Sequence, residues 1–336
     1  MHSRCFVVVG ILCSGVLLIA STIAVAQTPS PALLVLEKDD HSLAIVDPTA
    51  LKVVARVDAG PDPHEVVASD DGKFAYISNY GAFSSPHHTL SVVDLVAQKA
   101  LPAIDLSPLL APHGLQFLDG KVYFTAEGSK VIGSYNPASQ RVDWILGIGQ
   151  NRTHMVFVAK DLSHIFTSDV NSGTITIIEP DKNADVSGWA ETHVPVGKGP
   201  EGFDVSPDGK VLWAANARDG TVSIIDVATK KVLQTVDAKV KSANRVKFTP
   251  DGRLVLISLL GGSDLVVMDA TSRGVIKRIN LGDGSAGILI APEGKLAYVA
   301  VSRGNFVSVI NLETLQISGR IQTGKGPDGM AWAVRK

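Results

Sequence analysis

The chain has 336 residues, with 31 Lys and Arg against 33 Asp and Glu, and a formal net charge of −2 at neutral pH. This near balance, without any basic or acidic run, gives no indication of binding to nucleic acid or to an anionic membrane surface. The only two cysteines, Cys5 and Cys13, lie within the first 26 residues. Once that segment is removed, an internal disulfide, a cysteine metal site and thiolate chemistry are all excluded.

The first 26 residues have the pattern of an export signal. Arg4 supplies a positive charge, the run Phe6 to Ile23 is almost wholly apolar, and residues 24–26 form an Ala-x-Ala cleavage site. An uncleaved anchor is the alternative, since about 20 apolar residues can span a bilayer, but the cleavage site favours removal. We therefore expect a signal peptide over residues 1–26, one domain over residues 27–336, and a periplasmic or secreted protein without a membrane span.

From residue 33 onward the chain repeats one unit seven times. The clearest copy runs from Gly199 to Val236 and contains four short apolar segments separated by turn residues. The copies are roughly 40–48 residues apart, which is the period of a four-stranded propeller blade. Each third segment ends on an Asp, Asn or Glu, which we interpret as a cap on the following turn rather than as a metal or acid–base group. These residues are Asp47, Asp94, Asn136, Glu179, Asp226, Asp269 and Asn311.

The two ends of the repeat array complement each other. The N-terminal copy opens with second, third and fourth strands over Leu33 to Leu36, Leu43 to Val46 and Val53 to Val57, and lacks a first strand. The missing strand is in Gly326 to Val334, which matches Gly199 to Val205. We expect this strand to complete the N-terminal blade and close the ring, which removes the open sheet edges. The predicted fold is an all-β, seven-bladed β-propeller of four-stranded antiparallel blades.

Three motifs recur in the copies: second strands such as Phe74 to Asn79 and Leu212 to Asn216, Ser-Pro-Asp-Gly turns, and Gly-x-Gly-Pro-x-Gly leaders. Over residues 33–336 these motifs resemble the YVTN β-propeller repeat family. The resemblance implies the propeller fold. Relatives of this kind include surface and periplasmic proteins, and similar seven-bladed propellers include lactonases and metal-binding enzymes, so the resemblance assigns no single activity.

One mouth of the central channel gathers polar residues. Because strand direction alternates within a blade, the leaders into the innermost strands and the loops between second and third strands share this mouth. Aligned leaders place one residue per blade there, in the order His64, His113, His154, Glu201, Asn244, Ala286 and Asp328. Three histidines from consecutive blades predict a zinc, copper or iron site with an open coordination position. Glu201 is then a candidate general base or fourth ligand.

Further polar residues favour a small anionic partner. Arg152 precedes His154 and Arg245 follows Asn244, and Arg218 and Arg303 occupy neighbouring loops. A positive rim around the mouth would attract a carboxylate. We therefore count Arg152, Arg245, Asn244 and Asp328 as candidate ligand-binding residues.

Three functions remain open at this point. The first is a metal-binding propeller that acts as a redox or hydrolytic enzyme or as a carrier. The second is a metal-independent, lactonase-like or lyase-like enzyme that uses His154, Glu201, Arg152 and Arg245 on a small carboxylate. The third is a non-catalytic scaffold that holds an envelope protein, in which the channel histidines only solvate the mouth. A monomer is expected in each case.

Overall fold

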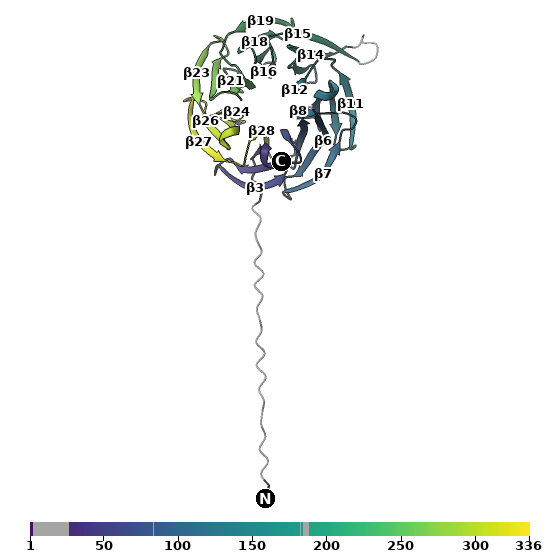
Figure 1. Ribbon diagram of the computed structural model, residues 1–336, viewed down its shortest axis with the longest axis vertical. Coiled ribbons are helices and arrows are strands. Elements are labelled where there is room, and N and C mark those ends of the chain that lie inside the picture. Colours follow the sequence, from purple (N-terminus) through teal and green to yellow (C-terminus); the bar gives the residue numbers. More distant parts are fainter. Residues whose placement is uncertain (3–26, 83, 182, 184–187) are drawn as a thin grey trace.

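The computed structural model describes residues 1–2, 27–82, 84–181, 183 and 188–336 and contains seven four-stranded sheets around a central channel (Figure 1). The predicted seven-bladed antiparallel propeller is confirmed. We number as blade 1 the sheet that contains β1, and the others follow in chain order. The predicted signal peptide lies almost wholly outside the described residues. Within the described part of the chain, no helix has the length and apolar character needed to cross a membrane.

Four classes of strand build the blades, from the channel outward. The innermost strands are β28 (Pro327–Ala333), β4 (Pro63–Ala68), β8 (Pro112–Leu118), β12 (Thr153–Val158), β16 (Pro200–Val205), β20 (Ala243–Phe248) and β24 (Ser285–Ile290). The second strands are β1 (Ala32–Glu37), β5 (Phe74–Ala82), β9 (Lys121–Ala126), β13 (Ile165–Asp169), β17 (Val211–Asn216), β21 (Leu254–Leu259) and β25 (Leu296–Val301).

The outer half of each blade completes the sheet. The third strands are β2 (Ser42–Asp47), β6 (Ser85–Asp94), β10 (Val131–Asn136), β14 (Thr174–Pro180), β18 (Thr221–Asp226), β22 (Asp264–Asp269) and β26 (Phe306–Asn311). The outermost strands are β3 (Lys52–Asp58), β7 (Lys99–Asp105), β11 (Arg141–Gly147), β15 (Trp189–Pro195), β19 (Lys231–Val236), β23 (Val275–Asn280) and β27 (Gln316–Gln322). Short 3-10 turns η1 (Lys38–Asp40), η2 (Glu127–Ser129) and η3 (Ser302–Gly304) follow three of the second strands.

The hydrophobic core lies between blades. Each of the described core clusters joins residues of two neighbouring blades, as where Tyr76 of blade 2 packs with Phe124 of blade 3. Second strands are therefore covered on both faces, which explains why β1 and β21 are buried along their whole length. Each such large apolar side chain contributes about 1.5–3 kcal/mol when it is fully removed from water. This packing makes the innermost strands rigid supports around the channel.

The C-terminal strand closes the ring as predicted. β28 pairs antiparallel with β1, with Ala333 opposite Ala32 and Ala331 opposite Leu34, and gives the sheet order β28-β1-β2-β3. Figure 1 shows β28 beside the channel within the blade that also carries β3. The closing blade therefore joins chain segments about 300 residues apart, in keeping with an uninterrupted ring.

The Asp and Asn residues at the ends of the third strands cap turns, as interpreted from the sequence. Asp47 Oδ1 accepts hydrogen bonds from the backbone N–H groups of Thr49 at 2.8 Å and Ala50 at 3.1 Å. Asp94, Asn136, Asp226, Asp269 and Asn311 accept equivalent bonds. Glu179 differs because its carboxylate contacts the His164 and Lys230 side chains.

Candidate functional site

A β-bulge in each of the blades that carry the site directs one side chain into the channel. The register between innermost and second strands shifts at the same point from blade to blade. In blades 2 to 5 the shifts fall at Pro63/Val66, Pro112/Leu115, Thr153/Val156 and Pro200/Phe203. A bulge re-aims the side chains that it contains. Each shift encloses two residues, and the first of each pair is the position that the leader alignment predicted: His64, His113, His154 and Glu201.

Hydroxyl groups on the second strands lock these bulges to the next blade. Thr125 Oγ1 accepts the backbone N–H of Gly114 at 2.9 Å and donates to the His154 carbonyl at 2.8 Å. Ser78 Oγ donates to the His113 carbonyl at 2.8 Å in the same way. Gly114 is required by this close approach, because a Cβ there would lie 2.7 Å from the His154 carbonyl oxygen. The two histidines are therefore fixed by backbone contacts before any ligand arrives.

The three predicted histidines lie side by side. The ring centroids of His113 and His154 are 3.8 Å apart, and those of His64 and His113 are 5.0 Å apart. His64 differs in its partners, because its Nε2 contacts Lys38 Nζ at 2.7 Å and Asp62 Oδ2 at 3.2 Å. The hydrogen bond and charge of His64 hold the pKa of Asp62 well below its usual value. One ring nitrogen of His64 is therefore already satisfied by the protein.

A buried carboxylate completes the group. Glu127, in η2, is 6 % exposed and accepts hydrogen bonds from His154 Nδ1 and from the Tyr80 hydroxyl, the latter at 2.5 Å. Arg152 Nε lies 3.5 Å from Glu127 Oε2, the oxygen that also accepts from Tyr80. Burial alone raises the pKa of Glu127, but the bonds from His154 and Tyr80 and the charge of Arg152 outweigh burial and hold this pKa below its usual value. Glu127 is thus an ionised acceptor.

Two imidazole nitrogens in this group have no hydrogen-bond partner among the described residues. They are Nδ1 of His113 and Nε2 of His154, in side chains that are 3 % and 2 % exposed. Burial, followed by the neighbouring charges of His154 and His64, holds the pKa of His113 well below its usual value, so that its ring is neutral. Ligand atoms of His113, Glu127 and His154 lie within 4.8 Å of one another. This arrangement can hold a single metal ion.

Glu201 lies on the far side of His154 from Glu127. Its Oε1 is 3.7 Å from His154 Nε2 and accepts a hydrogen bond of 3.4 Å from Asn244 Nδ2, and its side chain is 21 % exposed. The side-chain oxygen Oδ1 of Asn244 is buried without a partner among the described residues. Glu201 and Asn244 therefore flank the open side of the histidine pair, where a bound molecule could reach them.

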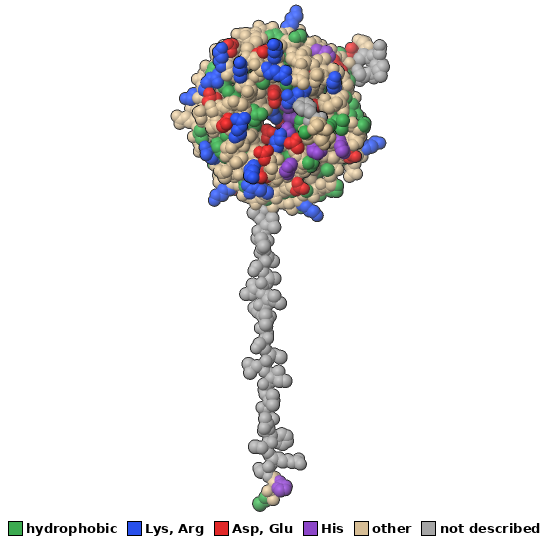
Figure 2. All heavy atoms as spheres, in the orientation of Figure 1, with side chains coloured by type: hydrophobic (Ala, Val, Ile, Leu, Met, Phe, Trp, Pro, Cys, Tyr) green, Lys and Arg blue, Asp and Glu red, His purple; other side chains and the backbone are tan. Residues whose placement is uncertain are grey.

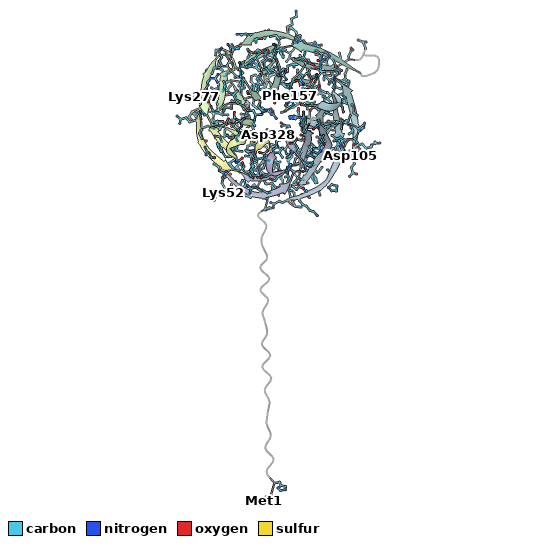
Figure 3. All side chains as sticks on the ribbon, viewed as in Figure 1. Met1, Lys52, Asp105, Phe157, Lys277 and Asp328 are labelled. Atoms are coloured by element: carbon cyan, nitrogen blue, oxygen red, sulfur yellow. The ribbon has the colours of Figure 1, made fainter. Side chains whose placement is uncertain are left out.

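An ion pair crosses the channel below the site. Arg245 of β20 reaches Glu65 of β4, on the other side of the ring, and the two side chains are 8 % and 13 % exposed. Asp328 lies nearby, and burial raises its pKa against the opposing charge of Arg245. A cavity of about 370 Å³ continues beneath this pair, lined mainly by apolar side chains that include Phe157. Figure 3 labels Asp328 and Phe157 beside the channel, whereas Lys52, Asp105 and Lys277 lie on the outer edge.

The face that carries the mouth is rich in charge. Figure 2 shows Asp and Glu side chains and histidines gathered around the centre of this face, with Lys and Arg side chains among them. Of the predicted residues, the structure brings His113, His154, Glu201 and Asn244 together. Arg152 joins them through Glu127. Arg245 pairs with Glu65 across the channel, Asp328 lies near this pair, and His64 lies to one side with Lys38.

Sequence reasoning missed Glu127 and Tyr80. Glu127 directly follows the second strand β9, and Tyr80 holds the equivalent position inside the longer β5. Each contacts the channel residue of the next blade: Tyr80 packs against His113, and Glu127 bonds to His154. Lys38 and His64 repeat the pattern one blade earlier. The signal was present in the sequence, because polar residues occupy this position in the three blades that precede the three histidines.

Solved structures share the fold at low sequence identity. The chain is similar to Kuenenia stuttgartiensis hydrazine synthase, with 18 % identity, a TM-score of 0.65 and coverage of 80 % of this chain and 89 % of that one. It is also similar to a putative 6-phosphogluconolactonase from Bacteroides uniformis, with 15 % identity, a TM-score of 0.72 and coverage of 90 % of this chain and 99 % of that one. A third similar structure is dihydro-heme d1 dehydrogenase NirN in complex with DHE, with 15 % identity, a TM-score of 0.66 and coverage of 93 % of this chain and 77 % of that one. No curated protein matches the chain. These likenesses support the propeller that the YVTN resemblance implied, and no more.

A family model described as the cytochrome D1 heme domain matches residues 119–295. The group of His113, Glu127 and His154 does not fit a haem. The His113 and His154 rings are in contact, and the cavity beside Glu127 holds about 100 Å³, whereas pockets for ligands of that size measure about 300–1,000 Å³. A wider cleft of about 510 Å³ includes His64, but Lys38 and Asp62 occupy its Nε2.

Membership of the family rests on the length of the matched segment and not on whether this group of side chains fits a haem. The matched segment begins in blade 3 and ends in blade 7, and it includes both His154 and Glu201. It spans more than half of the 336 residues. The chain therefore belongs to the cytochrome D1 heme domain family.

Proposed function

We propose that this propeller binds one divalent transition-metal ion at the channel mouth, through His113, His154 and Glu127, and presents it to a ligand that enters from the mouth. The observation that carries the proposal is the gathering of ligand atoms of His113, His154 and Glu127 within 4.8 Å of one another, with His113 Nδ1 buried and without a partner among the described residues. An ion held by Glu127 and His154 Nδ1 would take the place of the hydrogen bond between them. Buried polar atoms are almost always satisfied, and those that are not call for an explanation such as an absent ion.

The donor set narrows the choice of ion. Two imidazoles and one carboxylate form catalytic zinc sites and also bind iron(II) with positions left open, and imidazole suits copper as well. Calcium and magnesium are disfavoured because they take oxygen ligands. Tyr80 and Arg152 hold Glu127 in place, in the way that outer contacts orient metal ligands elsewhere.

The ring position of His64 argues for a two-histidine site. Its Nε2 is bound by Lys38 and Asp62, and its ring lies farther from His154 than that of His113. The three-histidine set expected from the sequence therefore becomes a His113–His154–Glu127 set, with Glu201 on the open side as the candidate group to bind or deprotonate an incoming molecule. We further propose that residues 1–26 are an export signal and that the protein is periplasmic or secreted.

A second function follows from the same contacts. Glu127 orients His154 through Nδ1 and leaves Nε2 facing the channel, as the carboxylate of a catalytic dyad orients its histidine. In the absence of a metal, His154 would act as the general base of a lactonase-like or lyase-like enzyme. Activity that survives chelation would favour this second function.

The test is metal retention. Protein without its signal segment is exposed to one equivalent each of copper, zinc, iron and manganese, desalted, and measured by elemental mass spectrometry. We expect close to one ion per chain in the wild type, and loss of that ion in H113A, H154A and E127Q with the fold retained by circular dichroism. The H64A variant should keep the ion.

The matched control is H164A, because His164 lies in the loop before β13 and contacts Glu179 instead of the channel. Retention by H164A together with loss in H154A supports the site. Equal retention in wild type and H154A, or no retention in wild type, contradicts it.

A further inference from the structure

A second cleft opens beside the mouth, over blades 5 to 7. It has a volume of about 620 Å³ and is lined by Arg218, Lys241 and Arg303, with Glu201 at its channel end and Leu260 in its wall. Its described lining includes no histidine, so it is separate from the metal ligands. The three cations come from three different loops, and their convergence needs an explanation, because like charges repel.

Glycines hold the three cationic side chains in place. Each aliphatic stem lies across a glycine with positive φ, so close that a Cβ on that glycine would meet the stem at 3.0–3.2 Å. The pairs are Gly199 with Arg218, Gly220 with Lys241 and Gly284 with Arg303. A positive φ is energetically unfavourable for a residue that has a Cβ, whereas glycine adopts it without strain. The backbone under these cations is thus shaped to let the stems lie flat and direct their charged ends into the cleft.

The cleft exists because blade 6 departs from its neighbours. Equivalent hydrogen bonds align the loops: Ala217 N–H to the Gly199 carbonyl in blade 5, Leu260 N–H to the Ser242 carbonyl in blade 6, and Ser302 N–H to the Gly284 carbonyl in blade 7. In blades 5 and 7 the acceptor is a glycine, and an arginine follows the donor residue. Blade 6 has Ser242 in place of the glycine and Gly261 in place of the arginine. The missing side chain leaves space between the two flanking arginines.

The cations of the cleft are incompletely neutralised. Within the described residues, neither Arg218 nor Lys241 forms an ion pair, and Arg218 Nη2 donates to the neutral Asn171 Oδ1 at 2.7 Å. Arg303 pairs with Asp283 at 2.7 Å, but both side chains are about 60 % exposed, which leaves the pair weak. Glu201 is the acid in the cleft, and it lies at the end nearest His154.

We infer that this cleft binds a small organic carboxylate, with the carboxylate group between Arg218, Lys241 and Arg303 and the carbon chain along Leu260 toward Glu201. Guanidinium groups pair with carboxylates through two parallel hydrogen bonds, which explains the use of arginine at two of the three positions. Because Glu201 repels a second negative charge at its end, the ligand presents an uncharged or hydrogen-donating group there. The inference goes beyond the metal proposal and does not depend on it.

The experiment measures binding of 4-hydroxybutyrate, a monocarboxylate with a terminal hydroxyl, by isothermal titration calorimetry on chelator-treated, metal-free protein at constant ionic strength. We expect R218Q and K241Q each to weaken binding at least about fivefold, while K277Q, on the outer edge of blade 6, leaves it unchanged. H154A should also leave 4-hydroxybutyrate binding unchanged, which separates this site from the metal site. Absence of 4-hydroxybutyrate binding in the wild type, or equal loss in K277Q, overturns the inference.

A second variant tests whether binding needs the open cleft or only its positive charge. S242G/G261R gives blade 6 the glycine and arginine of its neighbours, which fills the cleft while adding a positive charge. We expect it to abolish 4-hydroxybutyrate binding, and binding that is unchanged or stronger in this variant overturns the inference. Inorganic phosphate is titrated in parallel. Phosphate that binds more tightly than 4-hydroxybutyrate and is lost in R218Q would overturn the assignment to a carboxylate.

Discussion

Replacing Glu127 by Gln tests the buried group at the mouth without any ligand. The carboxylate is 6 % exposed and is bonded by His154 and Tyr80, with Arg152 at 3.5 Å. A glutamine oxygen can still accept from Tyr80, but the charge that holds His154 and Arg152 is lost. Hydrogen bonds to charged groups contribute about 1.5–3 kcal/mol each, and the 25 % exposure of Arg152 lets water replace part of its contact. We therefore expect E127Q to lower the free energy of unfolding by about 2–3 kcal/mol.

The pH dependence of this loss has a defined sign. Because the pKa of Glu127 is lowered in the folded protein, its contribution is fully present above the unfolded value of about 4.3 and is lost as pH falls through the folded value. Urea unfolding in the presence of chelator at pH 7 and at lower pH measures the difference between wild type and variant, which should shrink toward acid. E201Q is the control, with an expected cost below about 1 kcal/mol because that side chain is partly exposed. An E127Q variant within about 0.5 kcal/mol of wild type at pH 7 refutes the reasoning.

Three further predictions concern stability. Asp169 is fully buried, and burial raises its pKa despite hydrogen bonds from threonine hydroxyls. Its ionisation therefore lowers the free energy of unfolding as pH rises from the unfolded pKa of about 3.9 through the folded pKa. D169N should be more stable than wild type in urea unfolding at pH 7, and a less stable variant contradicts this. R245M leaves Glu65 buried without its partner and should cost about 3–5 kcal/mol, most of which the double variant R245M/E65L should recover; an unaffected single variant would argue against the ion pair. Deletion of residues 326–336 should give an aggregating or poorly folded protein on size-exclusion chromatography, and a monomer with wild-type melting refutes the closure by β28.

The propeller could be predicted from the sequence because its signals are local. Each blade carries its own turn residues and its own capping side chain, such as Asp47, within one period of the repeat. The closing strand was recognisable because Gly326 to Val334 matches the first strand of other copies. Alignment of the leaders also placed His113, His154 and Glu201 correctly in one ring, since the bulges that direct them recur at equivalent positions.

The contacts between blades could not be predicted in the same way. An alignment of repeats compares equivalent positions, whereas Glu127 meets His154 by reaching from one position in blade 3 to a different one in blade 4. Arg245 was expected on the rim of the mouth, but its long side chain crosses the channel to Glu65, 180 residues away. The partner that such a side chain reaches depends on the channel width and on the twist of the blades, and neither can be predicted from the sequence of one repeat.

The number of imidazoles on the bound ion tests the central claim most directly. Pulsed electron paramagnetic resonance on the copper(II)-loaded protein counts coordinated histidine nitrogens. The His113–His154–Glu127 site predicts two imidazoles in wild type and in H64A, and one in H113A or H154A. Three imidazoles in wild type that fall to two in H64A, or none in wild type, would contradict it.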